Sequence, residues 1–145
     1  MPTIRITLLG RFEVAVDASP VAESSWTRRH PAALVKVLAM APGRRLHREQ
    51  VIDLLWPDDS IGEAVPKLHK AAHFARRAIG VPNAVVLRGD HVLLCPDAET
   101  TVDVELFEGL AHRALAQEDV AAARRALSVY SGELLPQDRY EAWAE

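Results

Sequence analysis

The chain has 145 residues, of which 49% are hydrophobic and 26% are charged, and its formal net charge is −3. This composition is ordinary for a globular protein and excludes a disordered or collagen-like chain. The apolar runs are shorter than the roughly 20 residues that a membrane-spanning helix needs, so no membrane partner is expected. The first residues lack a signal-peptide pattern, and Cys95 is the single cysteine, so a reducing, cytoplasmic location is expected.

The net charge taken alone argues against a nucleic-acid partner, but the charges are unevenly distributed. Residues 1–100 contain 13 Lys and Arg against 11 Asp and Glu, whereas residues 101–145 contain 4 against 9. The acidic residues are therefore concentrated toward the C-terminus. Such a difference between two parts of a chain indicates two modules.

The first 24 residues alternate apolar and polar side chains, which predicts a small antiparallel sheet. One strand is expected at residues 4–8 and a second at residues 12–16, separated by a turn at Gly10-Arg11. A third short strand is expected near residues 21–22.

Three helices and a hairpin are predicted next. The first helix follows Thr27, has Pro31 in its first turn, and ends at Pro42-Gly43. The second covers residues 48–56 and the third residues 62–79, which Gly80 ends; Pro66 fits the third helix only near its first turn. The hairpin is predicted at residues 85–94, with its turn at Arg88-Gly89-Asp90-His91.

The remaining residues predict a helical hairpin. Asp103 is expected to be the N-cap of its first helix. The apolar stripe of that helix is predicted to contain Leu106, Phe107, Leu110, Ala114 and Leu115. The stripe of the second helix is predicted to contain Val120, Ala123, Leu127 and Tyr130. Tyr140 and Trp143 are expected either to begin a third element or to fold back onto the two helices.

Apolar and polar residues separate into two arcs around the predicted helix 62–79. The apolar arc is mostly alanine, which lets a helix lie close to its neighbours. The opposite arc carries Lys67, Lys70, His73, Phe74 and Arg77.

A charged outer face is often only solvated, but two details favour a binding surface here. Glu63, in the first turn, is the one acidic residue of the predicted helix, and Phe74 is predicted to lie exposed among the cations. An apolar group in such a place suits a surface that a partner covers. In a DNA major groove, Lys and Arg meet phosphates or guanine edges, and an apolar side chain meets a thymine methyl. Arg88, in the hairpin turn, adds a cation for the DNA backbone.

The residues do not favour catalysis, a cofactor or a metal. His69 and His73 lie four positions apart, which places two imidazoles on one helix face. Their segment lacks the glutamate of a zinc-protease motif, and no third ligand is evident nearby. Neither a glycine-rich phosphate loop nor a nucleophile motif occurs, so no enzyme is expected.

Four stretches together resemble one known family over essentially the whole chain. They are ITLLGRFEVAVDASPV, LAMAPGRRLHREQVIDLLWPDD, ARRAIG and VDVELFEGLAHRALAQEDVAAARRALSVYSGELLPQDRYEAWAE. They look like the Streptomyces antibiotic regulatory protein (SARP) family, and the most specific parts are Leu54 to Asp58 and Gly132 to Trp143.

This resemblance implies an α+β winged helix-turn-helix of OmpR/PhoB type at residues 1–97, with an N-terminal antiparallel sheet, three helices and a C-terminal wing hairpin. An all-α, tetratricopeptide-like helical hairpin, the start of a bacterial transcriptional activator domain, would follow at residues 98–145. Helix 62–79 would be the recognition helix in the major groove, and residues 85–94 would be the wing. The loop at Asp58-Asp59 would face RNA polymerase.

The function that follows is a sequence-specific DNA-binding transcriptional regulator. It would be an activator that binds promoter direct repeats on double-stranded DNA, contacts RNA polymerase, and acts at the bacterial nucleoid. A homodimer through the C-terminal helices is a further expectation. The alternative is a protein-interaction module whose winged helix has lost DNA binding, because Pro66-Lys67 stand where the family often has Asn-Thr.

Overall fold

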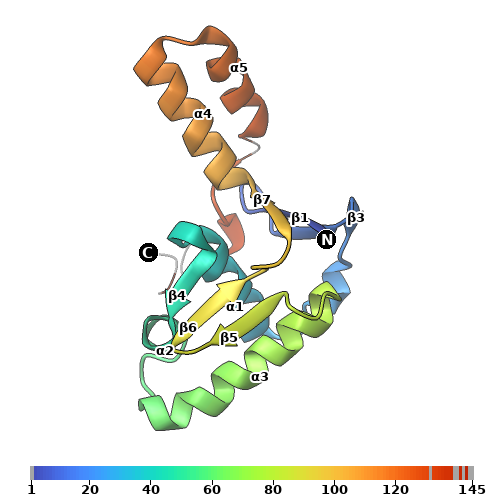
Figure 1. Cartoon of the computed structure of the whole chain (residues 1–145), viewed down its shortest axis with the longest axis vertical. Coiled ribbons are helices and arrows are strands. Elements are labelled where there is room, and N and C mark those ends of the chain that lie inside the picture. Colours follow the sequence, from blue (N-terminus) through green and yellow to red (C-terminus); the bar gives the residue numbers. More distant parts are fainter. Residues whose placement is uncertain (1, 131, 139–140, 142, 144–145) are drawn as a thin grey trace.

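The computed structural model describes residues 2–130, 132–138, 141 and 143 (Figure 1). The strands are β1 (Thr3–Thr7), β2 (Glu13–Val16), β3 (Ser19–Pro20), β4 (Arg45–His47), β5 (Val85–Arg88), β6 (His91–Leu94) and β7 (Glu99–Val102). The α-helices are α1 (Arg29–Met40), α2 (Arg48–Leu55), α3 (Ile61–Ile79), α4 (Asp103–Gln117) and α5 (Val120–Val129). Short 3₁₀ turns are η1 (Glu23–Ser25), η2 (Pro42–Arg44) and η3 (Pro136–Asp138).

The N-terminal sheet has four strands in the order β3-β2-β1-β7. The pair β1–β2 is antiparallel, as predicted, with Ile6 opposite Val14. The pair β2–β3 is antiparallel too, but β3 is Ser19–Pro20 and not residues 21–22. The prediction of a purely antiparallel sheet is nevertheless wrong, because β7 pairs parallel to β1, with Ile6 opposite Val102. The four residues of β7 show no clear alternation of apolar and polar side chains. They form a strand because they pair with β1, which is distant in the sequence.

The predicted hairpin is confirmed as β5 and β6, which pair antiparallel from Val85 and Leu94 to Arg88 and His91. A third strand, β4, pairs with β6 and was not predicted. Its three residues are too few to show a period, so only the pairing reveals it.

The hydrophobic core lies between the N-terminal sheet, the three helices and the hairpin. Helix α1 passes through its middle, with Leu34, Val35 and Leu38 fully buried. Helix α3 crosses the bottom of the molecule in Figure 1 and presents its small residues to the core, as the sequence predicts. Its buried residues are Ala64, Leu68, Ala71, Ala72, Ala75 and Ile79.

Helix α3 has well-defined ends. Ser60 accepts a hydrogen bond from the backbone N–H of Glu63, and the Glu63 carboxylate accepts one from the Ser60 N–H, which is a capping box. Gly80 ends the helix in the left-handed conformation, at φ 80°. Pro66 lies in the second turn, beyond the position predicted for it. It is tolerated because Gly62, whose carbonyl loses its usual donor, is exposed to water.

The helical hairpin of α4 and α5 projects away from the rest of the molecule (Figure 1). Asp103 is not the N-cap of α4, which is Val102. Its carboxylate instead accepts hydrogen bonds from the backbone N–H groups of Leu8 at 2.9 Å and Leu9 at 3.0 Å. The predicted capping residue therefore ties the start of the hairpin to the segment that follows β1.

The predicted stripes of this hairpin are correct only in part. Leu110 is buried and Phe107 and Ala114 pack beside it, as predicted, but Leu115 is 84% exposed. The stripe predicted for α5 is wrong for Val120 and Leu127, which are 64% and 73% exposed, whereas Tyr130 lies against the Phe107 ring of α4, with 5.5 Å between the centroids. The residues of α5 that pack inward are Ala122, Ala126 and Val129.

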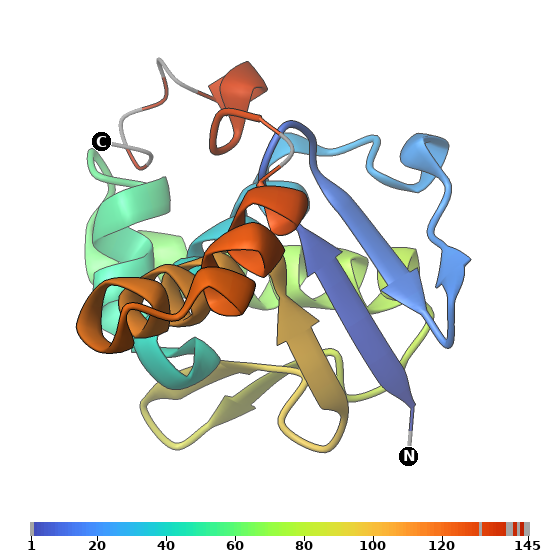
Figure 2. The ribbon, with the colours of Figure 1, turned by 90° about the horizontal axis from the view of Figure 1, so that it is seen from above.

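The C-terminal segment returns to the N-terminal sheet. Leu134 forms an antiparallel bridge with Leu9, and the Leu135 N–H donates to the Leu8 carbonyl at 2.8 Å. Figure 2 shows η3 beside the turn between β1 and β2. Trp143 packs against the main core and not against the α4–α5 hairpin, and Tyr140 lies outside the described residues.

None of the helices in the described part of the chain combines the length and the apolar character that crossing a membrane requires.

Candidate nucleic-acid interface

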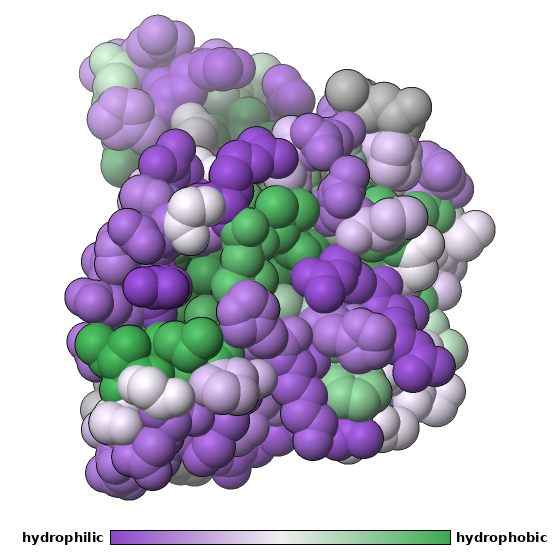
Figure 3. Space-filling view, turned by 60° about the horizontal axis from the view of Figure 1, so that its bottom comes forward, coloured by the Kyte–Doolittle hydropathy of each residue, from purple (hydrophilic) through white to green (hydrophobic). Residues whose placement is uncertain are grey.

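The outward face of α3 carries the residues that the sequence singled out. Lys67, Lys70, His73 and Arg77 are exposed, whereas Phe74 is half-buried. Figure 3 turns the bottom of the molecule forward and shows hydrophilic side chains over much of this side, interrupted by hydrophobic areas. The helix therefore presents a cationic face opposite its alanine-rich buried face.

The cations of this face differ in how far their charge is neutralised. Lys67 forms an ion pair with Asp59, which precedes the helix. Within the described residues, Lys70 and Arg77 form no ion pair. These two side chains are the ones most available to an anionic partner, and the charge of Lys67 is partly compensated.

Phe74 does not lie bare among the cations, so that prediction is wrong. The Arg28 guanidinium carbon lies 3.9 Å from the centroid of the Phe74 ring. The His73 ring meets Phe74 edge-on, with 5.3 Å between the centroids. Phe74 is thus covered by a residue that precedes α1, and it supports a cation.

The hairpin is held against α3 and α2. The Arg76 guanidinium donates from Nη1 to the Val85 carbonyl at 2.8 Å, which fixes the first strand of the hairpin beside the recognition-helix candidate. The Arg48 backbone N–H donates to the Asp90 carbonyl at 2.8 Å, at the turn. Arg88 is exposed beside this turn, as predicted, with no ion pair to another described residue.

The sequence did not single out Arg28 and Arg29, which the fold brings to the side of α3. They border a hollow together with Lys67 and Lys70. The sequence shows two adjacent arginines at the start of a predicted helix. The neighbouring residues in the sequence do not indicate which other element these arginines face. That placement depends on the packing of α1 against α3.

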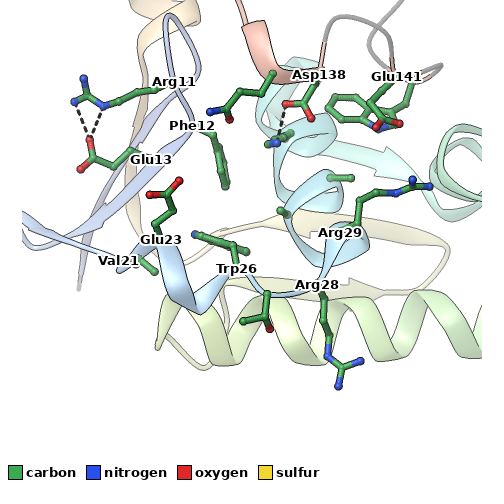
Figure 4. Close-up of a pocket in the computed structure, with 16 residues that line it drawn as sticks. Arg11, Phe12, Glu13, Val21, Glu23, Trp26, Arg28, Arg29, Asp138 and Glu141 are labelled. Atoms are coloured by element: carbon green, nitrogen blue, oxygen red, sulfur yellow. Dashed lines mark hydrogen bonds and ion pairs between the residues drawn. The ribbon is translucent and has the colours of Figure 1, made fainter.

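A larger pocket, of about 580 Å³, lies between β2, α1 and the C-terminal segment, and Arg28 and Arg29 border it as well. Figure 4 shows Arg28 turned away from it and across α3. Two cations at this pocket already have partners: Arg11 pairs with Glu13 at 2.9 Å, and Lys36 pairs with Asp138 at 2.7 Å. The pocket is a junction between the two parts of the chain.

Groups suited to metal binding or nucleophilic chemistry are sparse. The described residues contain no group of three His, Cys, Asp or Glu side chains arranged to hold a metal ion. Burial raises the pKa of the Cys95 thiol to about 11, so the thiol stays protonated and packs as a small apolar group.

The chain matches no protein-family model and no curated protein sequence. Its fold is similar to a solved structure described as Mycobacterium tuberculosis EmbR in complex with a low affinity phosphopeptide. The match has a TM-score of 0.72 at 21% identity and covers 99% of this chain. This chain spans 40% of the length of that EmbR chain. The likeness therefore shows an α+β fold followed by a helical hairpin, the fold of part of EmbR.

Proposed function

We propose that the chain is a DNA-binding transcriptional regulator that reads DNA through α3 and the β5–β6 hairpin. The observation that carries this proposal is the exposed face of α3, where Lys70 and Arg77 have no ion-pair partner among the described residues. Helix α3 is long enough, at 19 residues, to lie along a major groove. Duplex DNA supplies the dense negative charge that such a face binds.

The finer points of the proposal rest on the resemblance to the SARP family. Residues 1–97 would form the winged helix, and residues 98–145 would begin the activator module. The DNA-contacting residues would be Lys67, Lys70, His73, Phe74, Arg77 and Arg88. The regulator would activate promoters with direct repeats in the bacterial cytoplasm, and its loop at Asp58-Asp59 would face RNA polymerase.

The experiment that tests this proposal compares duplex binding by three proteins. Wild type, the double variant Lys70→Ala/Arg77→Ala, and the control Arg5→Ala/Arg113→Ala are titrated onto DNA chosen by wild type from a random pool. Arg5 and Arg113 are exposed on β1 and α4, so the control loses the same charge elsewhere. We expect the double variant to bind about tenfold more weakly or worse, and the control to bind like wild type.

Two outcomes would contradict the proposal. If wild type binds no duplex at low salt, the DNA-binding function fails. If both double variants lose affinity equally, the loss reflects net charge, and α3 is not the binding face. Anisotropy of a labelled duplex gives each affinity.

The alternative, a protein-interaction module, is favoured by the α4–α5 hairpin. Leu115, Val120 and Leu127 are large apolar residues exposed on it, at 84%, 64% and 73%. Such exposure is typical of a surface that another protein covers. Light scattering of wild type and Leu127→Glu tests it: a dimer that the variant dissociates would support a homodimer through these helices, and a monomer at all concentrations would oppose it.

A further inference from the structure

Arg28 is held in a defined position on the DNA-facing side. It precedes α1, is exposed, and lies over the Phe74 ring of α3 at 3.9 Å. An arginine that stacks on an aromatic face keeps its charge and its N–H donors while losing rotational freedom. Phe74 therefore fixes a cation from another element beside the cations of its own helix.

A hollow of about 340 Å³ lies next to this stacked pair, between the start of α1 and α3. Four of the residues around it are cationic: Arg28, Arg29, Lys67 and Lys70. None of its lining residues is acidic, and of the four cations only Lys67 has an ion-pair partner among the described residues. The hollow is therefore bordered by positive charges that can attract a single small anionic group.

His30 also lines the hollow, and its pKa responds to burial and to the charges around it. Its ring lies 4.9 Å from the Trp56 ring. The pKa of His30 is lowered, first by burial and then by Arg29, with a smaller lowering from Lys67. Glu141 and a hydrogen bond to the Leu55 backbone act in the opposite direction without reversing the shift. His30 is neutral at neutral pH, so the charge of the hollow comes from the arginines and lysines.

We propose that this hollow binds one backbone phosphate of the DNA on which α3 docks, through Arg28 and Arg29 together with Lys70. Phe74, which the family resemblance counts among the DNA-contacting residues, then acts instead as a positioning residue that holds Arg28 and contacts no base. A phosphate is small enough for the hollow, and no acidic side chain lines the hollow to compete with it for the cations. The inference rests on the proposed function. It adds the start of α1 to α3 and the β5–β6 hairpin as a part of the chain that contacts DNA.

The test is a double-mutant cycle on a duplex of random sequence, in which phosphate contacts are retained and base readout is absent. The variants are Arg28→Ala, Phe74→Leu, their combination and Arg29→Ala, with Arg5→Ala and Phe74→Tyr as the controls. We expect Arg28→Ala, Arg29→Ala and Phe74→Leu each to bind about fivefold more weakly, with the slope of log affinity against log salt reduced by about one for each arginine. The combined variant should bind no more weakly than Arg28→Ala, and Phe74→Tyr should bind like wild type.

The inference is overturned if Arg28→Ala and Arg29→Ala bind the duplex like Arg5→Ala while wild type binds normally. It is also overturned if the losses from Arg28→Ala and Phe74→Leu multiply, because Phe74 would then act independently of Arg28. Absence of wild-type binding would instead contradict the proposed function itself.

A second measurement is independent of the affinity. If a phosphate enters the hollow, it offsets the lowering of the His30 pKa by Arg29 and Lys67, so the imidazole NMR titration should move to higher pH in the DNA complex. An unchanged His30 titration in a saturated complex would place the phosphate elsewhere and contradict the assignment.

Discussion

At the scale of single residues, Phe74 shows what a sequence pattern can and cannot supply. Its place on the polar side of α3 follows from helical spacing, and the structure agrees that it does not join the core. Its partner, Arg28, lies before α1 and comes beside it only when α1 packs on α3. The exposed cations Lys70 and Arg77 were predictable because exposure follows from the period of one helix. The ion pair of Lys67 with Asp59 was not predictable in this way, because it depends on the geometry of the loop before α3.

His30 makes a prediction about stability and pH. Its pKa is lowered in the folded protein, so the unfolded chain binds its proton more readily as the pH falls. The stability that His30 contributes is present above the unfolded pKa of about 6.5 and is lost as the pH falls toward the folded value. We expect the free energy of unfolding of wild type, measured with urea, to fall between about pH 7 and pH 5. The same quantity should fall less for His30→Gln. Equal losses of stability in the two proteins would mean that protonation of His30 is not coupled to unfolding.

At the scale of elements, helices and strands with a clear period of apolar residues were predictable. Strands that exist only through pairing with a distant strand were not. Helices α1, α2 and α3 and the β5–β6 hairpin agree with their predicted positions to within a few residues. Strands β4 and β7 are short, and each is defined by pairing with a distant strand. In α5 the large residues suggested the buried side, but the small residues Ala122 and Ala126 face α4. Close approach of two helices favours alanine there, so residue size misled the prediction.

The contact of the C-terminal segment with the turn after β1 depends on a glycine. A Cβ atom on Gly132 would lie 2.9 Å from the Gly10 Cα, and Gly132 has φ 153°. We expect Gly132→Ala to lower the free energy of unfolding by about 1 kcal/mol or more. Gly109→Ala is the matched control, because Gly109 lies inside α4 with open space around its Cα. It should raise stability by up to about 1 kcal/mol through helix propensity. Thermal or urea unfolding measures both, and equal changes would contradict this contact.

At the scale of the whole molecule, the uneven charge distribution acquires a structural meaning. The acidic C-terminal part returns to the N-terminal part through the ion pair of Lys36 and Asp138, at 2.7 Å. Lys36 is 8% exposed, and its ammonium also lies 4.9 Å from the Phe12 ring. The order of sheet, three helices and hairpin was predictable from the sequence. The attachment of the C-terminal part was not, because β7, Asp103 and the Lys36–Asp138 pair all join residues far apart in the chain.

Removing one partner of this ion pair should destabilise the whole molecule. Asp138→Ala would leave the Lys36 ammonium nearly buried without its carboxylate, at a cost of roughly 3 kcal/mol. The double variant Lys36→Met/Asp138→Ala should recover much of that loss, because it removes the unpaired charge as well. Urea unfolding of the two variants and wild type provides the comparison. A single variant as stable as wild type would show that the pair does not hold the C-terminal segment.

The central claim, that the face built on α3 binds duplex DNA, is tested most directly by the salt dependence of wild-type affinity for a DNA duplex. Arg28, Arg29, Lys70, Arg77 and Arg88 are exposed on or beside α3 and the hairpin, and none of them has an ion-pair partner within the described residues. Each phosphate contact contributes about −0.9 to the slope of log affinity against log salt, so a slope between about −3 and −5 is expected. No binding at low salt, or a slope near zero, would contradict the account.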